Sequence, residues 1–87
     1  MIRQVTVKFP FTPEAKSQLR AIDRSTALGI LEAIARFGET GSGAFAPLHG
    51  EWQGCYRLRV GDYRVIYRPI HDGLEVIAVG HRSDIYR

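Results

Sequence analysis

The feature that most constrains this fold is a Gly-Asp pair, Gly61-Asp62, between two runs of alternating apolar and basic residues. Glycine at the first central position of a two-residue loop accepts positive φ, so the pair predicts a tight β-hairpin and fixes its register. Residues opposed across the two strands share a face of the sheet. One face is therefore expected to be apolar, with Tyr56, Leu58, Val60, Tyr63, Val65 and Tyr67. The other is expected to carry Arg57, Arg59, Arg64 and Arg68.

The arginine face needs an explanation, because like charges opposed across strands are destabilising. The hairpin register places Arg59 opposite Arg64, and these side chains should repel each other unless an anion lies between them. The alternative is a solvated face whose arginines point into water. Ten of the twelve basic residues are Arg, whose planar fork of donors suits phosphate. Four arginines on one face favour anion binding.

Length and composition narrow the class of protein. The 87 residues predict one domain, residues 1–87, and a hydrophobic fraction of 45% is typical of a folded globule. A net charge of +3 indicates an acidic or nucleic-acid partner. Cys55 is the only cysteine, so no intramolecular disulfide forms. No apolar run is long enough for a membrane span and no signal-peptide core is present, so we expect a cytoplasmic protein without membrane contacts.

The front half is expected to hold a strand and two helices. Residues 2–9 alternate polar and apolar side chains with β-branched content, which predicts a strand. The Thr-Pro pair at 12–13 is typical of a helix start and predicts a helix to about residue 22. An Asp then precedes an apolar stripe at helical spacing, which predicts a second helix over 24–37 ended by Gly38. The short link between them predicts an antiparallel helical hairpin.

The back half is expected to be a three-strand meander. Residues 38–54 contain five glycines and are expected to be a long functional or mobile connection. Asp72-Gly73 predicts a second hairpin turn, which would place His81 opposite Arg64 on the arginine face. A bulge at Pro69 would change this register. The expected class is α+β: a small antiparallel sheet with an N-terminal strand, an α-helical hairpin and a C-terminal three-strand meander.

Three segments carry a family resemblance: residues 47–50 (Pro-Leu-His-Gly), 56–67 and 80–86. Together they resemble the RelE/ParE superfamily of toxins from type II toxin–antitoxin systems. The resemblance implies the same α+β fold and a partner antitoxin, with operator DNA bound only by the toxin–antitoxin complex. RelE-type members cut mRNA on the ribosome without a metal or other cofactor, by attack of the 2′-hydroxyl on the adjacent phosphate.

The resemblance also implies roles for individual residues. Arg57 and Arg59 match the basic strand pair that holds the RNA phosphate, and Arg64 matches the arginine of the next strand. Arg82 and Tyr86 match the C-terminal basic and aromatic positions, where the tyrosine stacks on or orients the nucleotide. The catalytic set implied in this way includes Arg64, Arg82 and Tyr86.

The chain departs from the family at the proton acceptor. RelE has lysines at Arg57 and Arg59, and Arg does not release a proton near neutral pH. Some relatives have a Glu base at the position of Ala46. His81 is therefore the best titrating group for proton transfer, because an imidazole titrates near neutrality. The alternative is that His81 only bonds a backbone carbonyl. Glu51 is a reserve candidate for the missing carboxylate.

Other functions stay open on the sequence alone. The scattered acidic residues form no evident Mg²⁺ cluster, and no Cys/His spacing predicts zinc. A ParE-like toxin would have the same fold and would bind DNA gyrase without nuclease chemistry. A non-catalytic module that binds only antitoxin and operator DNA would suit the basic charge equally well.

Overall fold

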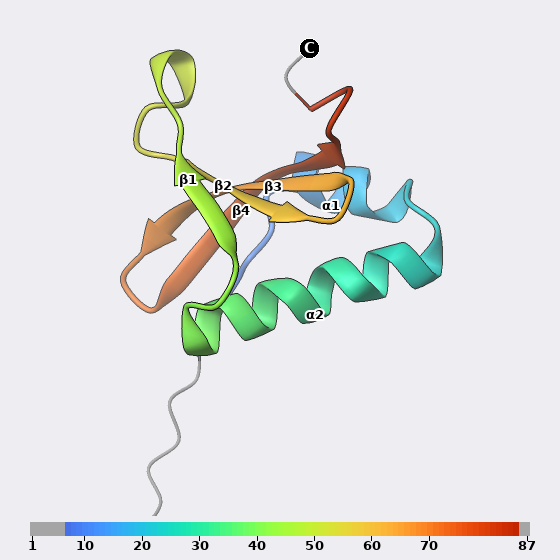
Figure 1. Cartoon of the computed structure of the whole chain (residues 1–87), viewed down its shortest axis with the longest axis horizontal. Helices are drawn as coiled ribbons and strands as arrows, with labels where there is room; N and C mark the ends of the chain where they lie inside the picture. The colour runs from blue at the N-terminus through green and yellow to red at the C-terminus, as the bar shows by residue number, and fades with distance from the viewer. Residues whose placement is uncertain (1–6, 86–87) are drawn as a thin grey trace, which may run out of the picture.

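The computed structural model describes residues 7–85 (Figure 1). Four strands of this part form one antiparallel sheet in the order β1-β2-β3-β4, which confirms the α+β class. None of the helices in residues 7–85 is long and apolar enough to cross a membrane. In chain order the elements are α1 (Pro13–Arg20), α2 (Arg24–Thr40), β1 (Ala44–Pro47), the 3₁₀ turn η1 (Gly50–Trp52), β2 (Tyr56–Val60), β3 (Tyr63–Ile70) and β4 (Gly73–His81).

The first hairpin has the predicted register. Val60 lies opposite Tyr63 and Arg59 opposite Arg64. Gly61 has a φ of 59°, so the glycine supplies the positive φ that the turn needs. The alternation of side chains then divides the residues of β2 and β3 between two faces of the sheet.

The core lies between α2 and one face of the sheet. Ile30 and Ile34 of α2 are buried there with side chains from three strands: Leu58, Val65, Tyr67, Val76 and Val79. In Figure 1, α2 runs along one side of the sheet. The opposite face, which carries Arg57, Arg59 and Arg64, is covered by neither helix, and we call it the open face.

Both predicted helix caps are present. The Thr12 hydroxyl accepts a hydrogen bond from the Ala15 amide at 3.1 Å and donates one to the Ile77 carbonyl at 3.1 Å. It therefore starts α1 and ties that helix to β4. An Asp23 carboxylate oxygen accepts from the Thr26 amide at 3.0 Å. This hydrogen bond holds the pKa of Asp23 below its usual value.

The predicted helix ends need correction. α1 ends at Arg20, and α2 continues through Gly38 to Thr40, where Gly41 ends it with a φ of 73°. α1 packs mainly along β4 and only slightly on α2. A Cβ placed on Gly29, inside α2, meets no atom within 4 Å.

The predicted first strand lies mostly outside the described residues, because 2–6 precede them. Within the described part this segment makes two isolated parallel bridges to β4, Lys8 to Gly73 and Phe11 to Val76. The Lys8 amide donates to the Asp72 carbonyl, and the Lys8 carbonyl accepts from the Leu74 amide, both at 3.0 Å. The segment thus covers the outer edge of β4.

The connection 38–54 contains a strand that the sequence did not predict. β1 pairs with β2, so that Phe45 lies opposite Leu58 and Ala46 opposite Arg57. The Phe45 ring packs on Phe37 of α2, with centroids 5.2 Å apart. β1 is an edge strand, which is where a strand tolerates a proline such as Pro47.

The second hairpin differs from the prediction by one residue. Ile70 lies opposite Gly73, so the turn is His71-Asp72 and not Asp72-Gly73, and the register shifts again between Ile66 and Tyr67. Gly73 is not needed for positive φ. It is needed because a Cβ there would overlap the Lys8 backbone. Consequently His81 lies opposite Tyr63, and Gly80 lies opposite Arg64.

Candidate active site

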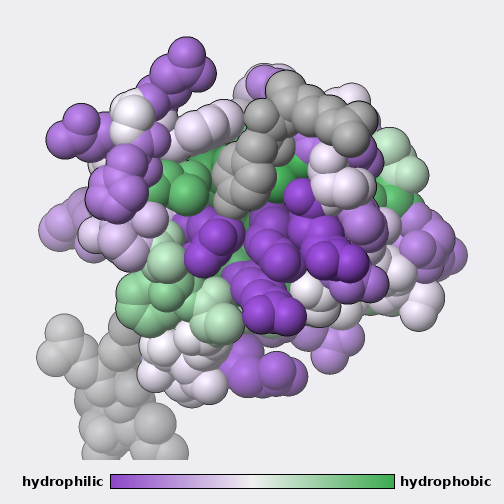
Figure 2. Space-filling model, turned by 45° about the horizontal axis from the view of Figure 1, so that its top comes forward, coloured by the Kyte–Doolittle hydropathy of each residue, from purple (hydrophilic) through white to green (hydrophobic). Residues whose placement is uncertain are grey.

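Basic side chains surround a pocket of about 500 Å³ on the open face. β2 and β3 each supply an arginine, and β4 and the turn after it supply the rest. Figure 2, which brings the top of Figure 1 forward, shows hydrophilic side chains gathered at the centre of the molecule. We call the pocket of about 500 Å³ the arginine pocket, and its lining residues are Arg57, Arg64, His81, Arg82 and Ser83.

The turn after β4 is fixed in place by backbone hydrogen bonds. The His81 carbonyl accepts from the amides of Asp84 at 2.9 Å and Ile85 at 3.0 Å, which closes the turn. The Arg82 amide donates to the Asp62 carbonyl at 2.8 Å and joins this turn to the first hairpin turn. A Cβ on Gly80 would lie 3.1 Å from the Ile85 side chain, so the chain folds back closely over the strand end.

Arg64 shows how the two opposed arginines are accommodated. Its Nη1 donates to the carbonyls of Gly61 at 3.1 Å and Tyr63 at 3.0 Å. These bonds direct the Arg64 guanidinium toward the hairpin turn. Arg59 is exposed and does not line the arginine pocket, although the sequence predicted it in the phosphate-binding set. Arg68 forms an ion pair with Glu75.

His81 lines the arginine pocket although its register was predicted incorrectly. It is the last residue of β4, where the chain turns, so it reaches the rim of the pocket without lying opposite Arg64. Its ring contacts Tyr63 edge-on, with centroids 5.5 Å apart. The Nδ1 atom lies 2.8 Å from the Ser83 hydroxyl oxygen and accepts from the Ser83 amide at 3.2 Å.

Two residues that contact the lining of the pocket were missed from the sequence. Ser83 bonds the His81 ring, and Asp62 lies 3.7 Å from the Arg82 guanidinium. A His-x-Ser pattern directly after a strand is a local signal that could have indicated the first contact, because serine side chains bond groups two residues away in turns. Nothing in the sequence pairs Asp62 with Arg82. Tyr86 lies outside the described residues.

Ala46 and Glu51, the two positions considered for a carboxylate base, lie outside the arginine pocket. Ala46, the position at which some relatives have a Glu base, lies opposite Arg57 and therefore shares its face of the sheet, although it does not line the arginine pocket. Glu51 lies in η1 and does not line the pocket. Among residues 7–85, no group of three or more His, Cys, Asp or Glu side chains is arranged to hold a metal.

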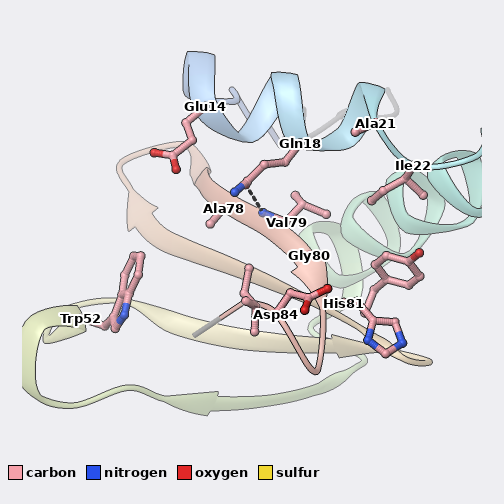
Figure 3. Close-up of a pocket in the computed structure, with 12 residues that line it drawn as sticks. Glu14, Gln18, Ala21, Ile22, Trp52, Ala78, Val79, Gly80, His81 and Asp84 are labelled. Carbon is pink, nitrogen blue, oxygen red and sulfur yellow. Dashed lines mark hydrogen bonds between the residues drawn. The ribbon is translucent and has the colours of Figure 1, made fainter. Parts of the chain in front are cut away.

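A second cavity of about 420 Å³ lies between α1 and β4 (Figure 3). Gln18 reaches across from α1, and its amide oxygen accepts from the Val79 amide at 2.8 Å. The lining includes Glu14, Asp84 and Trp52, and it shares His81 with the arginine pocket. Because it holds carboxylates and no arginine, this cavity suits an anion less well than the arginine pocket.

Comparison with known families decides the membership of the chain. The model of the ParE toxin of type II toxin–antitoxin systems, parDE, matches residues 10–86. The chain belongs to this family. It is therefore a toxin of the RelE/ParE superfamily, as the sequence motifs predicted. A search of curated proteins found no match.

Solved structures of toxins share the fold. The RelBE2 toxin–antitoxin complex from Mycobacterium tuberculosis matches with a TM-score of 0.78 and 26% identity, covering 94% of this chain and 98% of that one. The RelB–RelE complex from Methanococcus jannaschii matches with a TM-score of 0.70 and 22% identity over 88% of this chain and 94% of that one. The YoeB–YefM complex from Staphylococcus aureus matches with a TM-score of 0.71 and 15% identity, covering 87% of this chain and 97% of that one. Each of these neighbours was solved with an antitoxin.

Proposed function

We propose that this toxin is a metal-independent endoribonuclease that cleaves mRNA on the ribosome. The observation that carries the proposal is the arginine pocket, where three arginines and a histidine from separate segments line one cavity on the open face. Such a set suits a phosphodiester whose charge increases in the transition state, because fixed cations stabilise developing negative charge.

The arginines are proposed to bind the scissile phosphate. Arg57, Arg64 and Arg82 can offer several N–H donors in planar forks, and charge-assisted bonds to phosphate are strong. Arg59 lies outside the pocket on β2 and is proposed to add only to the long-range positive potential that attracts RNA. Tyr86 is proposed to stack on a base, on the strength of its motif match and the stacking that single-stranded RNA favours.

Proton transfer is assigned to His81. The arginines cannot accept a proton near neutral pH, and Ala46 supplies no carboxylate. Among the side chains that line the arginine pocket, His81 is the one that carries an imidazole, whose unprotonated nitrogen can accept a proton. In the proposed reaction the 2′-hydroxyl loses its proton toward His81 and attacks phosphorus, and the 5′-oxygen leaves.

A partner antitoxin is proposed to control the enzyme. The structures of the RelE and YoeB relatives are complexes of toxin with antitoxin. The open face of this chain carries several basic side chains, so an antitoxin that places acidic residues there would exclude RNA. Operator DNA is proposed to bind only to the toxin–antitoxin complex.

Cleavage by purified protein on programmed ribosomes tests the proposal. His81→Gln should slow single-turnover cleavage by about 100-fold or more, since general acid–base catalysis contributes that much. Primer extension would locate the cuts. Wild-type protein that leaves the mRNA intact would refute the nuclease function.

Gyrase inhibition is the second candidate, and the name of the matching family favours it. In that case the fold would act as a binding surface, and the arginine pocket would have no chemical role. A gyrase supercoiling assay separates the two functions, because the nuclease proposal predicts normal supercoiling at toxin concentrations that cleave mRNA.

A further inference from the structure

The two contacts between Ser83 and His81 define the state of the ring. A backbone amide can only donate, and the Ser83 amide contacts Nδ1 at 3.2 Å. In this geometry Nδ1 is the acceptor, which corresponds to the tautomer of the neutral imidazole that carries its proton on Nε2. It follows that the 2.8 Å contact to the Ser83 oxygen is a hydroxyl that donates to Nδ1.

This arrangement restricts how His81 can accept a proton. Nε2 already carries one and has no lone pair to offer. The only acceptor atom, Nδ1, is occupied by Ser83. The Ser83 oxygen, in contrast, keeps its lone pairs while its own proton points to Nδ1. Ser83 is exposed and lines the arginine pocket together with Arg57, Arg64 and Arg82.

We propose that the Ser83 hydroxyl is a catalytic residue that relays the substrate proton to His81. The inference rests on the proposed RNA cleavage and names the path that its proton takes. The 2′-O–H bond breaks and its proton passes to the Ser83 oxygen, while the Ser83 proton passes to Nδ1 and forms an imidazolium. The 2′-oxygen forms a bond to phosphorus, and the bond from phosphorus to the 5′-oxygen breaks.

Water supplies the proton that the leaving 5′-oxygen needs and takes up the proton that His81 has gained. The 5′-oxygen leaves with the bonding electron pair and takes a proton from water in the exposed pocket. The imidazolium at His81 releases its proton to the hydroxide that remains. The Ser83 hydroxyl then returns to its starting position as a donor to Nδ1, so neither residue is changed by the turnover.

A purely structural role for the hydroxyl would be redundant. The His81 carbonyl already accepts from two amides, which closes the turn without any side chain. The Ser83 amide alone also orients the ring. Removing the hydroxyl should therefore leave the turn and the ring in place and remove only the relay.

The test compares Ser83→Ala and Ser83→Thr in single-turnover cleavage of ribosome-bound mRNA. Ser25→Ala, at an exposed serine in the first turn of α2, is the matched control. Ser83→Ala should reduce the rate at saturating toxin at least 10-fold with unchanged affinity, and Ser83→Thr should restore it. The pH–rate profile of the wild type should show an ionisation that both Ser83→Ala and His81→Gln lose.

Two results would overturn the relay specifically. One is a wild-type rate for Ser83→Ala. The other is a ¹⁵N spectrum, recorded with the His81 ring neutral, that shows its proton on Nδ1. This measurement does not depend on activity. If the wild type itself does not cleave mRNA, the proposed function fails, and this inference fails with it.

Discussion

Substitution of Arg57 by Ala, compared with substitution of Arg59, tests whether the arginine pocket is a site or only part of a basic surface. The two arginines are two positions apart on β2 and on the same face. Each substitution lowers the net charge by one, from +3 to +2. Only Arg57 lines the pocket, so the pair separates local binding from total charge.

The expected magnitude follows from the hydrogen bond that Arg57 would make to the phosphate. A hydrogen bond to a charged group contributes about 1.5–3 kcal/mol. Removal of the Arg57 guanidinium should therefore weaken binding by about 10- to 150-fold. Removal of the Arg59 guanidinium takes away only a screened long-range attraction, and we expect less than about a threefold change at physiological salt.

The assay is binding of a 2′-O-methyl RNA oligonucleotide, which cannot be cleaved by 2′-hydroxyl attack, between 50 and 200 mM salt. Each phosphate of a single strand that is no longer neutralised reduces the slope of log K against log salt by about 0.7. Arg57→Ala should show this change and Arg59→Ala should not. Equal losses of affinity for both variants would refute the pocket and leave a diffuse basic surface.

Three further predictions concern the fold and the pocket rim. Gly73→Ala should destabilise the protein by about 1–3 kcal/mol because the new Cβ overlaps the backbone of the N-terminal segment. Gly29→Ala should stabilise the protein by about 0.5–1 kcal/mol, because the new Cβ inside α2 meets no other atom. Equal urea midpoints for the two variants would contradict this. Burial, with a smaller contribution from a neighbouring tyrosine, raises the pKa of Tyr67 to about 12. The folded state therefore favours the neutral phenol, and about 2–3 kcal/mol of stability should be lost as pH rises from 10 to 12. Tyr67→Phe should lose less over that range in parallel pH melts. Ala46→Glu places a carboxylate at the rim of the arginine pocket and should partly restore cleavage to His81→Gln, which single-turnover rates would show.

The first hairpin could be predicted because its signals are local. Gly61-Asp62 fixes the turn, and the turn fixes every opposed pair of β2 and β3. The turn of the second hairpin could not be predicted, because the glycine of the Asp72-Gly73 pair is not a turn residue. Gly73 makes room for the Lys8 backbone, a contact more than 60 residues away in the chain.

β1 was missed for a similar reason. Four residues with two alanines carry too little pattern to predict a strand, and the glycines around them indicate a loop. The strand exists because β2 offers it an edge on which to pair. That pairing also places Ala46 beside the pocket, which the sequence could not show.

The candidate site was partly accessible from the sequence. Arg57 and Arg64 follow from the register of one hairpin, Arg82 follows from a motif, and His81 follows from the need for a proton acceptor. All four line the arginine pocket. Arg59 is absent from the lining of the pocket, and alternation along β2 does not predict this difference, because it places Arg57 and Arg59 on the same face. The state of the His81 ring depends on a hydrogen bond from the turn that follows β4.

The most direct test of the central claim is to express the toxin without its antitoxin and map the 5′ ends of cellular mRNA. The proposed function predicts new cuts within translated sequences, abolished in Arg57→Ala and His81→Gln and retained in Arg59→Ala. Growth arrest with intact mRNA and inhibited gyrase supercoiling would contradict it.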